Sequence, residues 1–179
     1  MSEIEFFDTE SVATGAVGEP GARAFYIQAR NSDAQLTVLV EKEQIALLAK
    51  EASAFLDRLS EEYPEEPTAV PLERAELREP TVPLFRAQLI GLGFDPDQGL
   101  VLIELREHAS AELDDDEPEL DTDDLDDDEA GYVVRIYATR PQMRALIELG
   151  DSVVAAGRPP CPLCGMPMDP GGHRCPRWN

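Results

Sequence analysis

Residues 35–63 have the sequence QLTVLVEKEQIALLAKEASAFLDRLSEEY, and the spacing of the apolar side chains changes partway along this stretch. The apolar run at 35–40 predicts a β-strand. Beyond it, apolar residues recur every three or four positions, which is typical of a helix with one buried face; they are Ile45, Leu48, Ala52, Phe55, Leu56, Leu59 and Tyr63. The stretch therefore predicts a strand and then an amphipathic helix over about residues 42–62, which Pro64 ends.

Two further strands are predicted upstream, at 11–17 and 22–30, because apolar and polar residues alternate there. Between them lies Glu19-Pro20-Gly21-Ala22, in which proline presets the second position of a type II turn and glycine supplies the positive φ of the third. A second turn at residues 31–34 leads into the strand at 35–40. Turns this short predict an antiparallel meander.

The same order of elements is predicted again downstream. Strands are expected at about 82–92, 100–107 and 131–138, followed by a helix that begins near Thr139 as N-cap, with Pro141 in its first turn. The buried stripe expected for this helix is Met143, Leu146, Ile147, Val153 and Val154.

The fold class expected is α+β. Two strand-strand-strand-helix halves should form an antiparallel sheet with both helices on one face, because this arrangement buries both helical stripes. The two strand–helix junctions align weakly in sequence, so an internal duplication and a chance likeness of amphipathic patterns both stay open. We expect one core domain over residues 1–157 and a metal-binding tail over 158–179.

The chain is strongly acidic, with a formal net charge of −22. Residues 112–129 hold thirteen of the acidic side chains and no basic one, which leaves −9 on the remainder. Without a basic patch we expect neither nucleic acid nor an anionic membrane as a partner. The acidic run is predicted to be a disordered loop insertion; weak calcium binding and docking to a basic partner are the alternatives.

Three cysteines lie within the last twenty residues, which is not the pattern of a disulfide framework. With no apolar leader or membrane-length apolar run, we expect a cytoplasmic protein. Cys161 and Cys164 are three positions apart and are followed by Gly165, and His173 and Cys175 are two apart. These are four ligands of the kinds that zinc prefers, and they leave no position open, so we predict a structural Zn²⁺ site. An iron–sulfur site and an unmetallated tail are the alternatives.

Candidate chemistry in the core is sparse, and we predict no catalytic residue and no other cofactor. His108 shares a strand face with Glu104 and Arg106, while Tyr26 and Arg30 share a face of an earlier strand. These five residues could form an enzyme site or bind a small anion. The competing interpretation is that they are the solvated side of a sheet.

Several motifs resemble a bacterial family classed as domain of unknown function 3090. They are residues 17–21 (VGEPG), 25–30 (FYIQAR), 41–44 (EKEQ), 155–165 (AAGRPPCPLCG) and 172–177 (GHRCPR). The family is typical of actinobacteria and related bacteria, and some members are labelled repeat proteins. The resemblance implies that the tail ligands matter, but it implies no activity. The function expected is therefore a non-enzymatic module that binds another protein.

Overall fold

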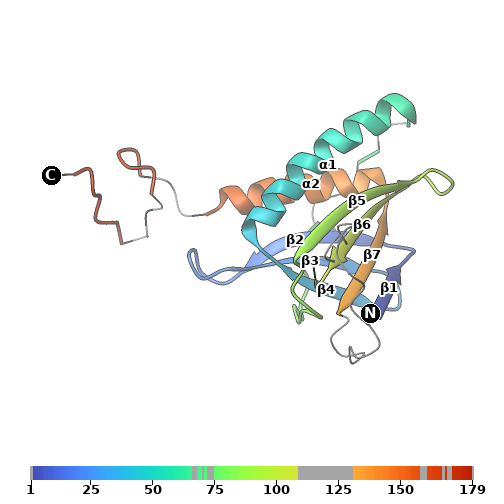
Figure 1. Ribbon diagram of the computed structural model, residues 1–179, viewed down its shortest axis with the longest axis horizontal. Helices are drawn as coiled ribbons and strands as arrows, with labels where there is room; N and C mark the ends of the chain where they lie inside the picture. The colour runs from blue at the N-terminus through green and yellow to red at the C-terminus, as the bar shows by residue number, and fades with distance from the viewer. Residues whose placement is uncertain are drawn as a thin grey trace, which may run out of the picture.

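The computed structural model describes residues 2–65, 68–69, 71, 75–108, 131–157, 161–166, 168 and 171–178. The acidic run at 112–129 lies outside these residues, so its predicted disorder stays a prediction. Within the described part, the strands are β1 (Ser2–Phe6), β2 (Ser11–Val17), β3 (Ala24–Arg30), β4 (Gln35–Val40), β5 (Leu89–Asp95), β6 (Leu100–Arg106) and β7 (Tyr132–Ala138), and the helices are α1 (Lys42–Glu62) and α2 (Arg140–Ala155) (Figure 1).

The α+β class is confirmed, and both halves contain the predicted three strands followed by a helix, with β1 added before the first set. The strands form two sheets where one was expected: a four-stranded sheet of order β1-β7-β6-β5 and a three-stranded sheet of order β2-β3-β4. β1, which the sequence analysis missed, pairs in parallel with β7, whereas the other pairs within the two sheets are antiparallel. Two sheets form because each strand triplet has one apolar face, and facing the triplets across a shared core buries both.

The predicted turns of the first half are present. The Ala22 N–H donates to the Glu19 carbonyl at 2.8 Å, and Gly21 has a φ of +100°, as a type II turn requires. The side chain of Asn31 accepts from the N–H groups of Asp33 and Ala34, which closes the second turn. These local contacts set the register of the meander.

The strand predicted at 82–92 begins only at Leu89. Before that point the chain runs beside β4: the Leu39 N–H donates to the Phe85 carbonyl at 2.9 Å, and the Ala87 N–H donates to the Leu39 carbonyl at 2.9 Å. One continuous segment thus leaves the edge of the three-stranded sheet and enters the other sheet as β5.

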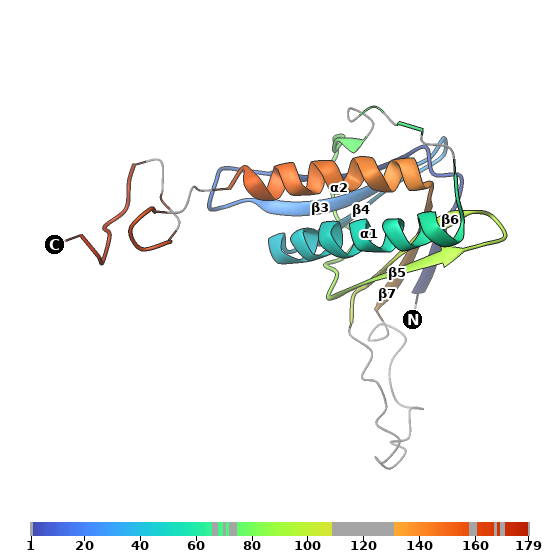
Figure 2. The same ribbon diagram turned by 90° about the horizontal axis from the view of Figure 1, so that it is seen from above.

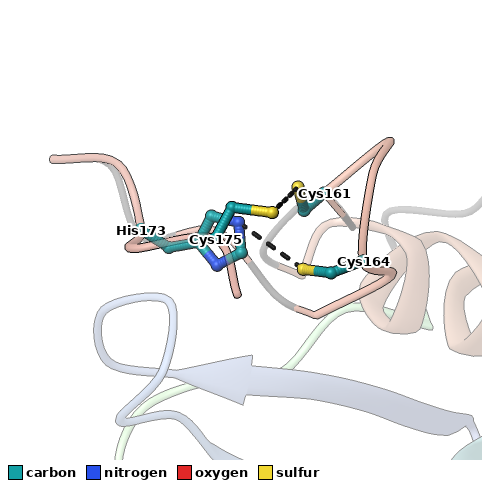
Figure 3. A group of neighbouring side chains, drawn as sticks. All are labelled: Cys161, Cys164, His173 and Cys175. Carbon is teal, nitrogen blue, oxygen red and sulfur yellow. Dashed lines mark hydrogen bonds between the residues drawn. The ribbon is translucent and has the colours of Figure 1, made fainter. Parts of the chain in front are cut away.

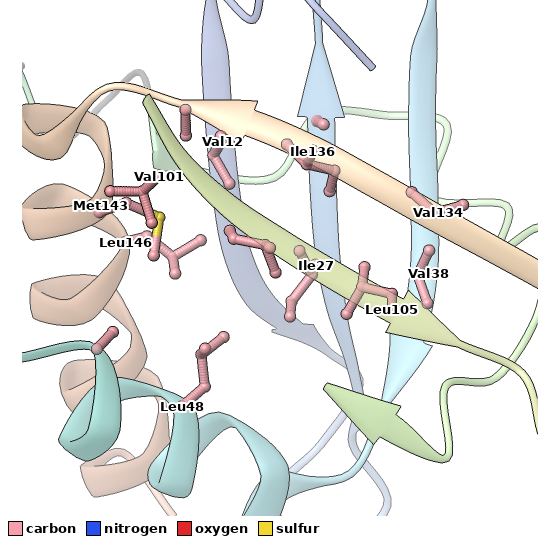
Figure 4. Close-up of a cluster of buried hydrophobic side chains, with 14 of the residues drawn as sticks. Val12, Ile27, Val38, Leu48, Val101, Leu105, Val134, Ile136, Met143 and Leu146 are labelled. Atoms are coloured by element: carbon pink, nitrogen blue, oxygen red, sulfur yellow. The ribbon is translucent and has the colours of Figure 1, made fainter. Parts of the chain in front are cut away.

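The two helices pack side by side and close the same side of the core (Figure 2). The core lies between them and the two sheets (Figure 4); its members include Val12, Ile27, Val38, Leu48, Val101, Leu105, Val134, Ile136, Met143 and Leu146. Gly150 lies where α2 approaches α1 closely, because a Cβ added there would lie 3.2 Å from a methyl group of Ile45. No helix among the described residues has the length and apolarity needed to cross a bilayer.

Candidate metal centre

The first ligand pair lies on a tight loop. The Cys161 N–H donates to the Met166 carbonyl at 2.8 Å, and the Gly165 N–H donates to the Cys161 carbonyl at 2.8 Å. Gly165 has a φ of +74°, in the left-handed region that a side chain disfavours. The loop therefore turns back on itself and brings Cys161 and Cys164 to one side.

The second pair lies on another turn that packs against this loop. Gly172 has a φ of +89°, and the Trp178 N–H donates to the Cys175 carbonyl at 3.1 Å. Arg177 joins the two turns, since its Nη1 donates to the Leu163 carbonyl at 3.1 Å. This contact links the two turns of the tail directly, apart from the contacts among the three cysteines and His173.

The four predicted ligands converge on one point (Figure 3). Their Sγ atoms and a His173 ring nitrogen all lie within 4.8 Å of one another. Sγ of Cys161 is 3.8 Å from Sγ of Cys175, and Sγ of Cys164 is 3.7 Å from Nε2 of His173. The sulfur pair is far beyond a disulfide bond of about 2.05 Å, and all three cysteines are free.

The 3.8 Å and 3.7 Å separations are close to those around a tetrahedral zinc ion. Zinc–sulfur bonds of about 2.3 Å at tetrahedral angles put two sulfurs about 3.8 Å apart, and a zinc–nitrogen bond of about 2.0–2.1 Å gives a sulfur–nitrogen distance of about 3.5–3.6 Å. Cys161 and Cys175 are buried in this tail, with exposed fractions of 6% and 7%. The residues present therefore fit a closed four-ligand site of the structural kind.

Backbone amides support the thiolate form of the first ligand. The N–H groups of Cys164 and Leu163 donate to the Cys161 sulfur and lower the pKa of its thiol to about 6. At Cys164 burial raises the pKa, although the Met166 N–H donates to that sulfur and opposes the shift. Hydrogen bonds to ligand atoms orient and tune metal sites, and the thiolate is the form of cysteine that ligates metal.

The five residues proposed for an alternative site do not lie together. Tyr26 and Arg30 are on β3 and Glu104 and Arg106 are on β6, in different sheets. Their buried neighbours, such as Ile27 and Leu105, point into the shared core (Figure 4). The polar side chains consequently face away from the core on opposite outer surfaces.

Glu104 and Arg106 do lie together. They belong to an ion-pair network with further members that the sequence analysis did not identify. Arg106 and Arg135 donate to the two oxygens of Glu104, each at 2.7 Å, and Arg135 also reaches Glu3 at 3.2 Å. The sequence analysis missed Arg135 because only the pairing of β7 with β6 brings it next to Glu104. The alternation of Arg135 with buried Val134 and Ile136 could have predicted that its side chain lies on the outer face. Both carboxylate oxygens of Glu104 are thus engaged.

His108 follows the end of β6 and is exposed. Its ring lies against the backbone of Gly131, where an added Cβ would lie 2.4 Å from the imidazole carbon Cδ2. It therefore packs on the chain that enters β7.

On the β3 face, Gln28 is fully buried. Its amide nitrogen donates to the Thr37 hydroxyl at 3.1 Å and to the Arg78 carbonyl at 2.9 Å, while its carbonyl oxygen accepts from the Arg78 N–H at 2.9 Å. The connection after α1 therefore covers part of the face that contains Tyr26 and Arg30. Side-chain pairing to a distant backbone leaves no local sequence signal.

The fold and the site define an α+β protein that carries a C-terminal cluster of three cysteines and one histidine. Residues 4–175 match a family described as "Protein of unknown function (DUF3090)", so the chain belongs to that family. The match extends from β1 to Cys175. No curated protein and no solved structure matches the chain.

Proposed function

We propose that this protein is a non-enzymatic, cytoplasmic protein-interaction module whose tail is folded by one structural zinc ion. Cys161, Cys164, His173 and Cys175 would hold the ion. Zinc bound there would cross-link the two turns. It would have no open coordination position for a substrate.

One observation carries the proposal: four ligand atoms from two separate turns lie within 4.8 Å of one another. Unpaired thiols would gain nothing from this convergence, whereas thiolates and an imidazole around a divalent cation are stabilised by it. A cytoplasmic location agrees with this set, because reducing conditions keep the three thiols available as ligands.

The interaction role is supported by what the tail exposes. Leu163, Met166 and Trp178 are exposed large apolar side chains on a unit of fewer than twenty described residues. Exposed aromatic and apolar groups grouped in this way are typical of surfaces that bind proteins. In the core, by contrast, the charged cluster around Glu104 is internally paired and offers no free acid–base group.

Metal analysis of protein purified without chelators tests the zinc site, and one equivalent of zinc per chain is expected. Cys164→Ser should lose the metal, whereas Met166→Ser, which alters an exposed non-ligand in the same loop, should keep it. A chain that carries far less than one equivalent and takes up none in reduced form contradicts the proposal. Affinity capture with the tagged wild type and with Cys164→Ser then tests the interaction role, which requires partners that depend on the tail.

A further inference from the structure

An apolar groove lies between α1 and the edge strand β5. Its volume is about 310 Å³, and α1 lines it with Gln44, Leu47, Leu48 and Glu51 while β5 contributes Ile90 and Leu92. Leu47 is 58% exposed, and Leu89, which also lines the groove, is 42% exposed. Exposure of large apolar side chains to water is unfavourable in free energy, so an exposed apolar groove is typical of a binding surface.

The tail presents a surface of complementary character. Leu163, Met166 and Trp178 are exposed, and Trp178, at 77%, is the most exposed of the large apolar residues described. Backbone contacts at Met166 and Trp178 and the bond from Arg177 to Leu163 hold the three around one cluster. A folded tail therefore offers a compact apolar knob.

The tail and the core that carries the groove differ in the sign of their net charge. Residues 158–179 contain three arginines and one aspartate, which gives the tail a net charge of +2 and leaves −24 on residues 1–157. The groove itself carries Glu51 at its rim, and Arg174 on the tail is exposed. The opposite charges of tail and core favour contact between them. Two cores carry like charge, which disfavours direct contact between cores.

The tail does not fill the groove of its own chain. It extends beyond the end of α2, away from the strands, in both views (Figures 1 and 2). Its root is nevertheless close to the helix that lines the groove, because a Cβ added at Gly157 would lie 2.9 Å from Nζ of Lys42. A second molecule that offers its groove to this tail can receive a tail in return.

We propose that two copies of this chain associate by reciprocal docking, with the zinc-bound tail of each copy seated in the α1–β5 groove of the other. This inference rests on the proposed zinc site, which folds the knob. Trp178 is the apolar anchor, Leu47 and its neighbours form the receiving surface, and the arginines of the tail face the acidic core.

Sedimentation velocity of the zinc-loaded full chain over a concentration series tests the inference. Trp178 is the only tryptophan in the sequence, so its emission reports docking directly. We expect dimers to form with rising concentration and the emission to shift to the blue in parallel. Trp178→Ala and Leu47→Glu should each weaken association by about tenfold or more, as loss of an anchor does. Val82→Ala, which removes an exposed apolar residue that is 73% accessible and outside both surfaces, should leave it unchanged.

Mixing the two variants gives the sharpest result. A Leu47→Glu chain keeps its tail and a Trp178→Ala chain keeps its groove, so the mixture retains one intact contact and should form heterodimers at lower concentration than either variant forms dimers with itself. A zinc-loaded monomer with solvent-exposed Trp178 overturns the inference and leaves the zinc site standing. A monomer whose emission is blue-shifted at every concentration overturns it in favour of docking within one chain, and a dimer insensitive to both variants overturns it in favour of another surface. Zinc content measured on the same samples shows separately whether the metal site has failed.

Discussion

Arg135 on β7 donates from Nε to an oxygen of Glu104 on β6 at 2.7 Å, and the two residues are direct partners in the register of these strands. Arg106 occupies the other oxygen at the same distance. Burial would raise the pKa of the Glu104 carboxyl, but the hydrogen bonds from Arg135 and Arg106 outweigh it and lower the pKa below the ordinary value of 4.5. This network fixes the outer face of the four-stranded sheet.

Glu104→Gln should destabilise the protein by about 1–2 kcal/mol at neutral pH, because charged hydrogen bonds to two arginines are lost. A carboxyl whose folded pKa is lowered stabilises the fold above its unfolded pKa, and this contribution disappears as pH falls through the folded pKa. The difference from wild type should therefore shrink below about pH 4. Urea unfolding across a pH series measures it, with exposed Glu10→Gln as the control; a difference that is constant with pH would contradict the argument.

Gln28→Ala should cost about 2–4 kcal/mol of unfolding free energy, since it leaves the Arg78 N–H and carbonyl and the Thr37 hydroxyl without their buried partner. Hydrogen exchange at Arg78 should accelerate at the same time, because the connection loses its anchor on the sheet. Denaturant unfolding and exchange are the measurements, and exposed Gln98→Ala is the matched control. A loss below about 0.5 kcal/mol, typical of surface substitutions, would show that the anchor is dispensable.

Local patterns predicted the helices well. The period of apolar residues placed α1 at 42–62, and the structure has it at Lys42–Glu62. Thr139 is the N-cap of α2, and its side chain accepts from the Gln142 N–H in a capping box. Both features depend on residues three or four positions apart, which a sequence displays directly.

The pairing of distant strands could not be predicted in the same way. β1 joins β7 across more than a hundred residues, and nothing in its alternation specifies that neighbour. The start of β5 was misplaced because residues 84–87 have apolar character suited to a strand but pair with β4. The clustering of the three cysteines with His173 was predicted because cysteine and histidine spacing is a chemical signal. The groove between α1 and β5 was not, because tertiary packing creates it.

Deletion of residues 112–129, closed by a short Gly/Ser linker, should leave the fold intact. β6 and β7 are paired as far as Arg106 and Val133, and the Glu107 N–H donates to the Tyr132 carbonyl at 3.0 Å, so a short linker can join them. Shortening the loop changes closure entropy by only about 1 kcal/mol or less. Thermal unfolding of the deletion variant should stay cooperative. A variant with a Gly/Ser segment of the original length separates length from charge, and lost cooperativity in the deletion would show that the acidic run is structural.

Removal of zinc should loosen the tail and spare the core. Apparent binding free energies at structural zinc sites are about 10–16 kcal/mol near neutral pH, ample to order the turns at 161–166 and 171–178. The core has its own buried cluster from both sheets and both helices, and the cluster includes none of the four ligands. Cys164→Ser, or chelation of the wild type, should therefore abolish zinc binding and raise the hydrogen-exchange rate of the Cys161 and Gly165 amides. The far-ultraviolet circular dichroism of the sheets and helices should stay unchanged, and Met166→Ser should keep both the zinc content and the circular dichroism of the wild type. Global unfolding on chelation would show that the core and the tail are one cooperative unit, and that the boundary drawn between residues 157 and 158 is wrong.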